Sequence, residues 1–103
     1  MEKLYLLAEG ANKRFPKVDE PFQMVTRLLE ECGEVASQVN HFEDSGIKRQ
    51  KHGEPSKQAL ANEIRQAMVA LAQLAAHYGV QEEVRQSIDA SLERIRLEGL
   101  IQA

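Results

Sequence analysis

The sequence contains few aromatic residues and a single cysteine, and each shortage excludes a class of protein. Aromatic residues make up 5% of the 103 residues and tryptophan is absent. Alanine and leucine therefore supply much of the apolar set, and both are strong helix formers, which favours packed helices over a sheet. Cys32 is the only cysteine. It excludes an internal disulfide and fits a reducing compartment.

Long apolar runs and a positive net charge are also missing. No window approaches the roughly 20 apolar residues that span a bilayer. The first apolar run, KLYLLAEG, is too short for a signal peptide and is soon followed by NKRF. The net charge of −3 gives no reason to expect general affinity for nucleic acid. We therefore expect one soluble, cytoplasmic domain over residues 1–103 that binds neither membranes nor nucleic acid.

The spacing of the apolar residues predicts an all-α fold, a four-helix bundle with two long central helices. The predicted helices lie roughly at residues 2–13, 19–43, 56–78 and 81–98. Asp19 is expected to cap the second helix and Ser56 the third, because both side chains accept hydrogen bonds from free backbone N–H groups. Gly79 is expected to end the third helix.

The two long helices are expected to bury broad apolar faces. In the second helix these positions are Phe22, Val25, Leu28, Leu29, Cys32, Val35, Ala36, Val39 and Phe42, and in the third Leu60, Ile64, Ala67, Met68, Leu71, Ala75 and Tyr78. A bundle of this length with so few aromatic residues buries only a modest core by itself. We therefore expect a homo-oligomer, a homodimer or a dimer of dimers, in keeping with the usual symmetry of protein assemblies.

The segment LLEECGEVASQ, residues 28–38, places three carboxylates close together in the second helix. At about 100° per residue, Glu31 lies roughly 80° from the centre of the apolar face, with Glu34 further round and Glu30 almost opposite. Glu63 lies at a similar angle on the third helix. If these two flanks face each other, Glu31, Glu34 and Glu63 converge.

Converging carboxylates would need a compensating charge. Two of them about 6 Å apart repel by roughly 3 kcal/mol at an effective dielectric near 20. Raised pKa values or a bound cation would relieve that repulsion. Hard oxygen ligands of this kind suit Mg²⁺ or Mn²⁺. The alternative is an ordinary solvated face, in which Arg27 pairs with Glu31 one turn away and the chain is a plain helical interaction module.

Three segments of the sequence resemble one family of enzymes. EECGE at 30–34, NEIRQAMVALAQLAAHYGV at 62–80 and SIDASLERI at 87–95 resemble the MazG-like all-α nucleotide pyrophosphohydrolases. That superfamily includes the all-α dUTPases and the phosphoribosyl-ATP pyrophosphatases. Its signature is E-E-x-x-E on one helix, followed by a variable loop and then by E-x-x-D on the next helix. The resemblance covers roughly residues 18–98.

The resemblance implies hydrolysis of a nucleoside triphosphate, or a related nucleotide, to the monophosphate and pyrophosphate. It implies Mg²⁺ or Mn²⁺ as cofactor, bridging phosphate oxygens and activating a water. The metal ligands would be Glu31, Glu34, Glu63 and the fourth motif position, Gln66. Glu30 and Glu34 would have catalytic roles, and Asp89 and Arg94 on the last helix would bind substrate.

Two departures from the family pattern bear on activity. Gln66 occupies the position where the family has Asp, so its amide oxygen can bind a hard cation but adds no charge. On the last helix, Asp89 and Ser91 occupy the positions where the family often has Asn and Lys, while Arg94 is kept. These departures leave open whether catalysis is reduced, altered or lost. The alternative function is therefore a catalytically weakened or inactive module that binds nucleotides and regulates.

The stretch between the two glutamate-bearing helices is the only long irregular segment, and it is basic. Its cations are Lys48, Arg49, Lys51, His52 and Lys57. Lys48, Arg49 and Lys51 are candidate substrate-binding residues, because cations here could close over a triphosphate. A solvated surface loop is the competing interpretation.

Overall fold

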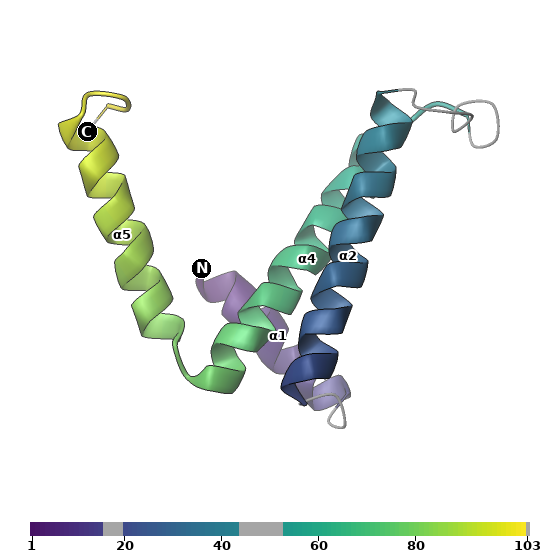
Figure 1. Cartoon of the computed structure of the whole chain (residues 1–103), viewed down its shortest axis with the longest axis horizontal. Helices are drawn as coiled ribbons and strands as arrows, with labels where there is room; N and C mark the ends of the chain where they lie inside the picture. Colours follow the sequence, from purple (N-terminus) through teal and green to yellow (C-terminus); the bar gives the residue numbers. More distant parts are fainter. Residues whose placement is uncertain (16–19, 44–52, 103) are drawn as a thin grey trace.

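The computed structural model describes residues 1–15, 20–43 and 53–102 and contains four α-helices there, with no strand (Figure 1). They are α1 (Glu2–Arg14), α2 (Pro21–Phe42), α4 (Lys57–Tyr78) and α5 (Gln81–Leu97). The predicted all-α class and the four helices are confirmed. In the described part of the chain, no helix has the length and apolar character to cross a membrane.

The helix ends follow from local hydrogen bonding. Ser56 caps α4 as predicted, its side chain accepting from the Ala59 N–H at 3.1 Å. The expected cap of α2 is wrong by one residue: the N-cap is Glu20, whose carboxylate accepts from the Gln23 N–H at 2.9 Å, while Asp19 lies outside the described residues. Gly79 ends α4 in the left-handed conformation with φ of 66°, which a glycine adopts without steric cost.

Helices α1, α2 and α4 pack together, with α2 running alongside α4 and α1 crossing it (Figure 1). Small side chains allow this close approach: Ala8 of α1 and Ala70 and Ala72 of α4 are buried, as is Met24 of α2. At the centre, the Arg27 guanidinium donates to the Gln73 side-chain oxygen at 3.3 Å, and the Gln73 amide donates to Asn12 at 3.0 Å. This chain of hydrogen bonds joins all three helices.

Helix α5 diverges from the other three, so that the molecule has the outline of a V (Figure 1). It has no buried residue. The radius of gyration is 16.9 Å, whereas a compact chain of this length has about 13 Å. The bundle expected from the sequence is therefore not confirmed for a single chain.

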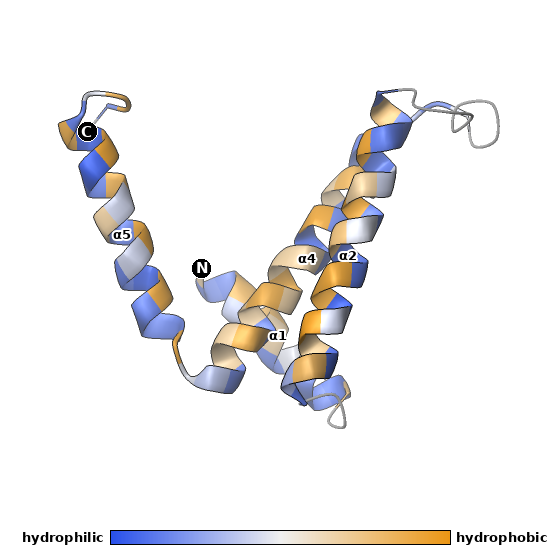
Figure 2. Cartoon of the chain, in the orientation of Figure 1, coloured by the Kyte–Doolittle hydropathy of each residue, from blue (hydrophilic) through white to orange (hydrophobic). Residues whose placement is uncertain are grey.

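The expected apolar faces are largely exposed within one chain. Phe22 is 81% and Leu29 66% exposed on α2, and Leu71 is 54% exposed on α4. The expectation that Cys32 packs in the core is also wrong, since the residue is exposed. The physical reason is that α2 and α4 meet along the flanks of these faces, where Met24, Ala70 and Gln73 lie. Much of both apolar faces therefore stays exposed in one chain, and hydrophobic residues recur along α2 and α4, where the ribbon is orange (Figure 2).

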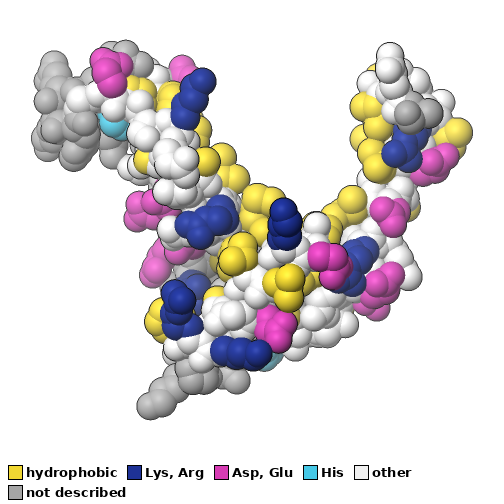
Figure 3. Space-filling model, turned by 180° about the vertical axis from the view of Figure 1, so that it is seen from behind, with side chains coloured by type: hydrophobic (Ala, Val, Ile, Leu, Met, Phe, Trp, Pro, Cys, Tyr) yellow, Lys and Arg dark blue, Asp and Glu magenta, His cyan; other side chains and the backbone are white. Residues whose placement is uncertain are grey.

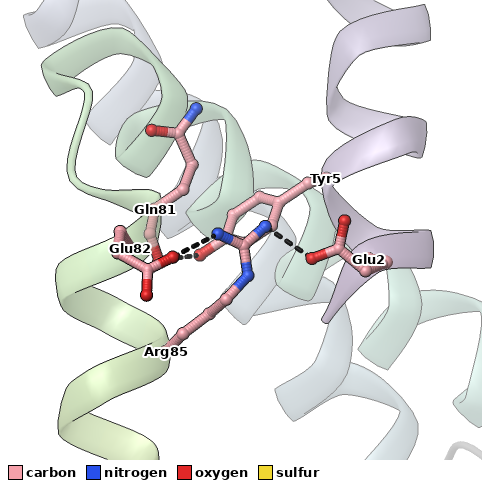
Figure 4. Close-up of polar contacts among 5 residues, drawn as sticks. All are labelled: Glu2, Tyr5, Gln81, Glu82 and Arg85. Atoms are coloured by element: carbon pink, nitrogen blue, oxygen red, sulfur yellow. Dashed lines mark hydrogen bonds and ion pairs between the residues drawn. The ribbon is translucent and has the colours of Figure 1, made fainter.

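The base of α5 is held by a group of polar contacts with α1 (Figure 4). The Arg85 guanidinium forms ion pairs with Glu2 of α1 and with Glu82, and it lies over the Tyr5 ring, 4.9 Å from the centroid. The Tyr5 hydroxyl donates to the Gln81 carbonyl at 3.4 Å. Burial lowers the pKa of Arg85, but hydrogen bonds and charge attraction from Glu2 and Glu82 outweigh it, and the net pKa is raised.

Candidate functional site

The glutamate-bearing flanks of α2 and α4 lie against each other, and a pocket opens where α1 joins them. The Arg27–Gln73 hydrogen bond crosses directly between these flanks. The pocket has a volume of about 320 Å³, with Glu31 from α2 and Gln66 from α4 in its wall. Two of the four predicted metal ligands therefore share one concave surface.

The state of Glu31 distinguishes it from the other acidic residues of its motif. Its side chain is half-buried, and its Oε2 atom is buried with no hydrogen-bond partner. The pairing of Arg27 with Glu31, which belonged to the alternative interpretation of a solvated face, does not occur in the described residues, where the Arg27 guanidinium donates to Gln73. A buried carboxylate oxygen without a partner costs about 1–3 kcal/mol, and more when the group is charged. The Oε2 atom of Glu31 could therefore bind a cation or accept a hydrogen bond.

Three arginines line the same pocket: Arg14 at the end of α1, Arg27 on α2 and Arg65 on α4. Among the described lining residues they outnumber the one carboxylate, that of Glu31, so this part of the wall favours an anion. Guanidinium groups bind phosphate oxygens in a two-pronged geometry, which makes them suitable for a di- or triphosphate. Apolar side chains, among them Phe15 and Val69, form other parts of the wall.

The remaining predicted metal ligands do not complete a site. Glu34 is exposed on α2 and Glu63 is half-buried on α4, and neither lines the pocket. Across residues 1–15, 20–43 and 53–102, no three acidic, histidine or cysteine side chains are grouped so that they could hold an ion. The donors present fit an ion held by Glu31 together with waters and phosphate oxygens, the usual way in which proteins bind Mg²⁺. They do not fit a cage built from protein ligands alone.

The other candidate residues lie elsewhere. Glu30 is exposed on α2. Asp89 and Arg94 are exposed on α5, and no residue of α5 lines the pocket. Lys48, Arg49 and Lys51 lie outside the described residues. Of the predicted substrate-binding residues, the two that the structure describes, Asp89 and Arg94, are therefore not brought to Glu31 within a single chain.

Sequence analysis missed Arg14 and Arg65, and it assigned Arg27 only a pairing role. Helical spacing contained part of the signal, since Arg65 directly precedes Gln66 and Arg27 is one turn before Glu31. Nothing in the spacing indicates that α1 ends beside these residues. The contribution of Arg14 depends on how α1 packs, which no local pattern encodes.

Comparisons with known proteins identify no relative. No family model matches the chain, and neither the curated proteins nor the solved structures contain a match. The functional conclusion must therefore be drawn from the pocket and from the sequence motifs.

Proposed function

We propose that this protein is a metal-dependent nucleotide pyrophosphohydrolase, a MazG-like enzyme that converts a nucleoside triphosphate or related nucleotide to the monophosphate and pyrophosphate. The single observation that carries the proposal is the unpartnered, buried oxygen of Glu31 in a pocket lined by three arginines. A divalent cation would satisfy the carboxylate, and a phosphate chain would satisfy the guanidinium groups. Both charges would be balanced by one ligand, a metal–nucleotide complex.

The acidic and amide side chains would bind the metal ion, and the basic side chains would bind the phosphates. Glu31 and Gln66 would hold Mg²⁺ or Mn²⁺, and the ion would supply charge neutralisation and a more acidic water. Arg14, Arg27 and Arg65 would orient the phosphate oxygens, and positioning of this kind accounts for much of catalysis in phosphoryl chemistry. Glu34 and Glu63, with Glu30 as a further catalytic candidate, would join the site only after their side chains or helices move.

The assembly and location belong to the same proposal. We propose a homodimer or a dimer of dimers, because the apolar faces of α2, α4 and α5 are exposed in one chain. Asp89 and Arg94 would then reach a nucleotide only through such an assembly. A cytoplasmic location fits the single free cysteine.

Thermal denaturation with and without metal tests the metal site. Mg²⁺ or Mn²⁺ at millimolar concentration should raise the melting temperature, since a ligand that binds only the folded state stabilises it. Glu31→Gln should abolish the metal-dependent rise, because it removes the carboxylate that would hold the ion. Glu83→Gln, the same change at an exposed α5 position, is the matched control. A metal-dependent rise that survives Glu31→Gln would contradict this site.

Product analysis tests the reaction. With Mg²⁺ present, pyrophosphate should appear from at least one nucleoside triphosphate, and Glu31→Gln should reduce its rate by two orders of magnitude or more. Arg65→Leu should raise the KM more than it lowers kcat, because Arg65 is proposed to bind phosphate. If a broad panel of nucleotides yields no pyrophosphate, the protein is not this enzyme.

A second candidate function is nucleotide binding without hydrolysis. The observation that favours it is the neutral Gln66 in the pocket wall, together with the fact that no residue of α5 lines that wall. In that case nucleotide should stabilise the protein and remain intact after incubation. Gln66→Asp should then introduce or increase turnover, whereas an active enzyme that Gln66→Asp leaves unchanged would argue against this alternative.

A further inference from the structure

Gly10 lies in the interior of α1, where a glycine is unfavourable. Glycine loses more backbone freedom than alanine when a helix forms, so it destabilises a helix interior. The described part of the chain does not require it, because its φ is not positive and a Cβ added to it would contact no other part within 4 Å. Alanine would therefore fit and would give a more stable helix. What the glycine provides is open space beside α1.

That space belongs to the pocket that holds Glu31 and the three arginines. The pocket-lining residues of α1 and its C-cap form the α1 wall: Leu6, Leu7, Gly10, Ala11, Arg14 and Phe15. Leu6 lies one helical turn before Gly10 and Arg14 one turn after it, on the same face of the helix. Arg14 is roughly 6 Å further along the helix axis than Gly10. The α1 wall thus changes from apolar to basic along its length.

The apolar part of the α1 wall is exposed and has no side chain that can form a hydrogen bond. Leu6 is 65%, Leu7 46% and Phe15 55% exposed. Seen from behind, the side on which α1 lies, hydrophobic side chains and Lys or Arg side chains lie next to one another (Figure 3). Arg14 is the only polar residue of the α1 wall. The apolar part can therefore contact the face of a flat ring but offers no hydrogen-bonding side chain to the edge of that ring.

We propose that the α1 wall binds the base of the nucleotide by its ring face, without reading its edge. A nucleotide matches the change along the wall, because its base is flat and largely apolar on its faces and its phosphates are anionic. The base lies beside the bare backbone of Gly10 and against Phe15, and the phosphates reach the arginines. Aromatic side chains stack on every base, since every base has a π-face. This inference rests on the proposed function and names its specificity: nucleotides with different bases bind alike.

Calorimetric titration with Mg²⁺ present compares ligands with and without a base. The probes are the α,β-methylene analogues of ATP, GTP, CTP and UTP, which lack the bond that the proposed reaction cleaves, and inorganic tripolyphosphate, which lacks a base. Tripolyphosphate carries at least as much negative charge, so tighter binding of the analogues measures the contribution of the base. We expect each analogue to bind about tenfold or more tighter than tripolyphosphate, and the four to lie within about tenfold of one another.

Gly10→Leu fills the proposed base subsite and keeps the helix, since leucine is a good helix former. It should weaken binding of every analogue by about tenfold, because it removes the contribution of the base, and should leave tripolyphosphate binding unchanged. Gly33→Leu is the matched control, because Gly33 is also a helical glycine with open space at its Cβ position but does not line the pocket. Gly10→Ala and Gly33→Ala should each raise the melting temperature by about 2–8 °C, as expected where the fold does not need a glycine.

The outcomes separate the base subsite from the proposed function. Equal binding of the analogues and tripolyphosphate would overturn the base subsite and leave the phosphate site intact. Gly10→Leu would also overturn it by binding the analogues as tightly as the natural chain does, or by losing tripolyphosphate as well. A preference of more than about a hundredfold for one base would show that its edge is read, contrary to this inference. If neither the analogues nor tripolyphosphate bind, the proposed function fails, and the base subsite fails with it.

Discussion

Helices α2 and α5 both carry an apolar stripe, yet their surroundings within one chain differ. Helix α2 lies along α4, buries Met24 and contributes Arg27 to a hydrogen-bond chain that reaches α1. Helix α5 buries nothing and is attached by the turn at Gly79 and by Arg85. An apolar stripe shows that a helix needs a partner, but it does not say whether that partner belongs to the same chain. Mutations in α1, α2 and α4 should therefore change the stability of the single chain, whereas mutations in α5 should act through association with another chain.

The largest effect is expected at the contact between α2 and α4. Met24→Ala should lower the free energy of unfolding by about 2–5 kcal/mol, because the side chain is buried and its loss leaves a cavity. Met24→Leu keeps most of the volume and should cost less than about 1.5 kcal/mol. Urea denaturation followed by circular dichroism measures both. Equal stability of the alanine and leucine variants would show that Met24 is not buried.

A smaller loss is expected where the three helices are joined by polar groups. Gln73 is 2% exposed and bonds to Arg27 and Asn12, so Gln73→Ala should cost about 1–3 kcal/mol by leaving two groups without partners. Gln58→Ala on the same helix is the control, since its one hydrogen bond, to Asn62, is exposed. Denaturant titration should show less than about 0.5 kcal/mol for the control. Similar losses for both variants would refute the bridging role of Gln73.

The smallest effect on stability, but a large effect on geometry, is expected at the base of α5. Arg85→Leu should leave the free energy of unfolding nearly unchanged, because its ion pairs are largely exposed. It should nevertheless widen the range of angles between α5 and α4. Spin labels at Lys57→Cys and Glu98→Cys, in a Cys32→Ser background diluted with unlabelled chain, report this as a distance distribution. Equal widths in the presence and absence of Arg85 would show that Arg85 does not set the angle.

Sequence analysis predicted the helices well because their signals are local. Ser56 and Gly79 mark the ends of α4, and each acts through backbone groups within a few residues. Apolar spacing likewise gave the extent of α5. The assignment of Asp19 rather than Glu20 as a cap is an error of one residue, of a size that boundary predictions commonly contain.

Packing was harder to predict because it depends on contacts distant in sequence. The breadth of the apolar faces suggested that Cys32 and Leu71 were core residues, whereas α2 and α4 meet along the flanks instead. The same angular analysis did indicate that Glu31 lies on such a flank, and it lines the pocket there. Arg14 could not be assigned, since its place depends on how α1 crosses α4. The candidate site was thus predictable on α2 and α4 and not beyond them.

Hydrogen exchange of the α5 amides, measured across a range of protein concentrations, tests most directly whether this helix depends on a second copy. We expect protection over residues 81–97 to rise with concentration in proportion to the dimer fraction, while protection at the centre of α4 persists at high dilution. Protection of α5 that does not change with concentration, or that is absent when the protein is concentrated, would contradict the proposed homo-oligomer.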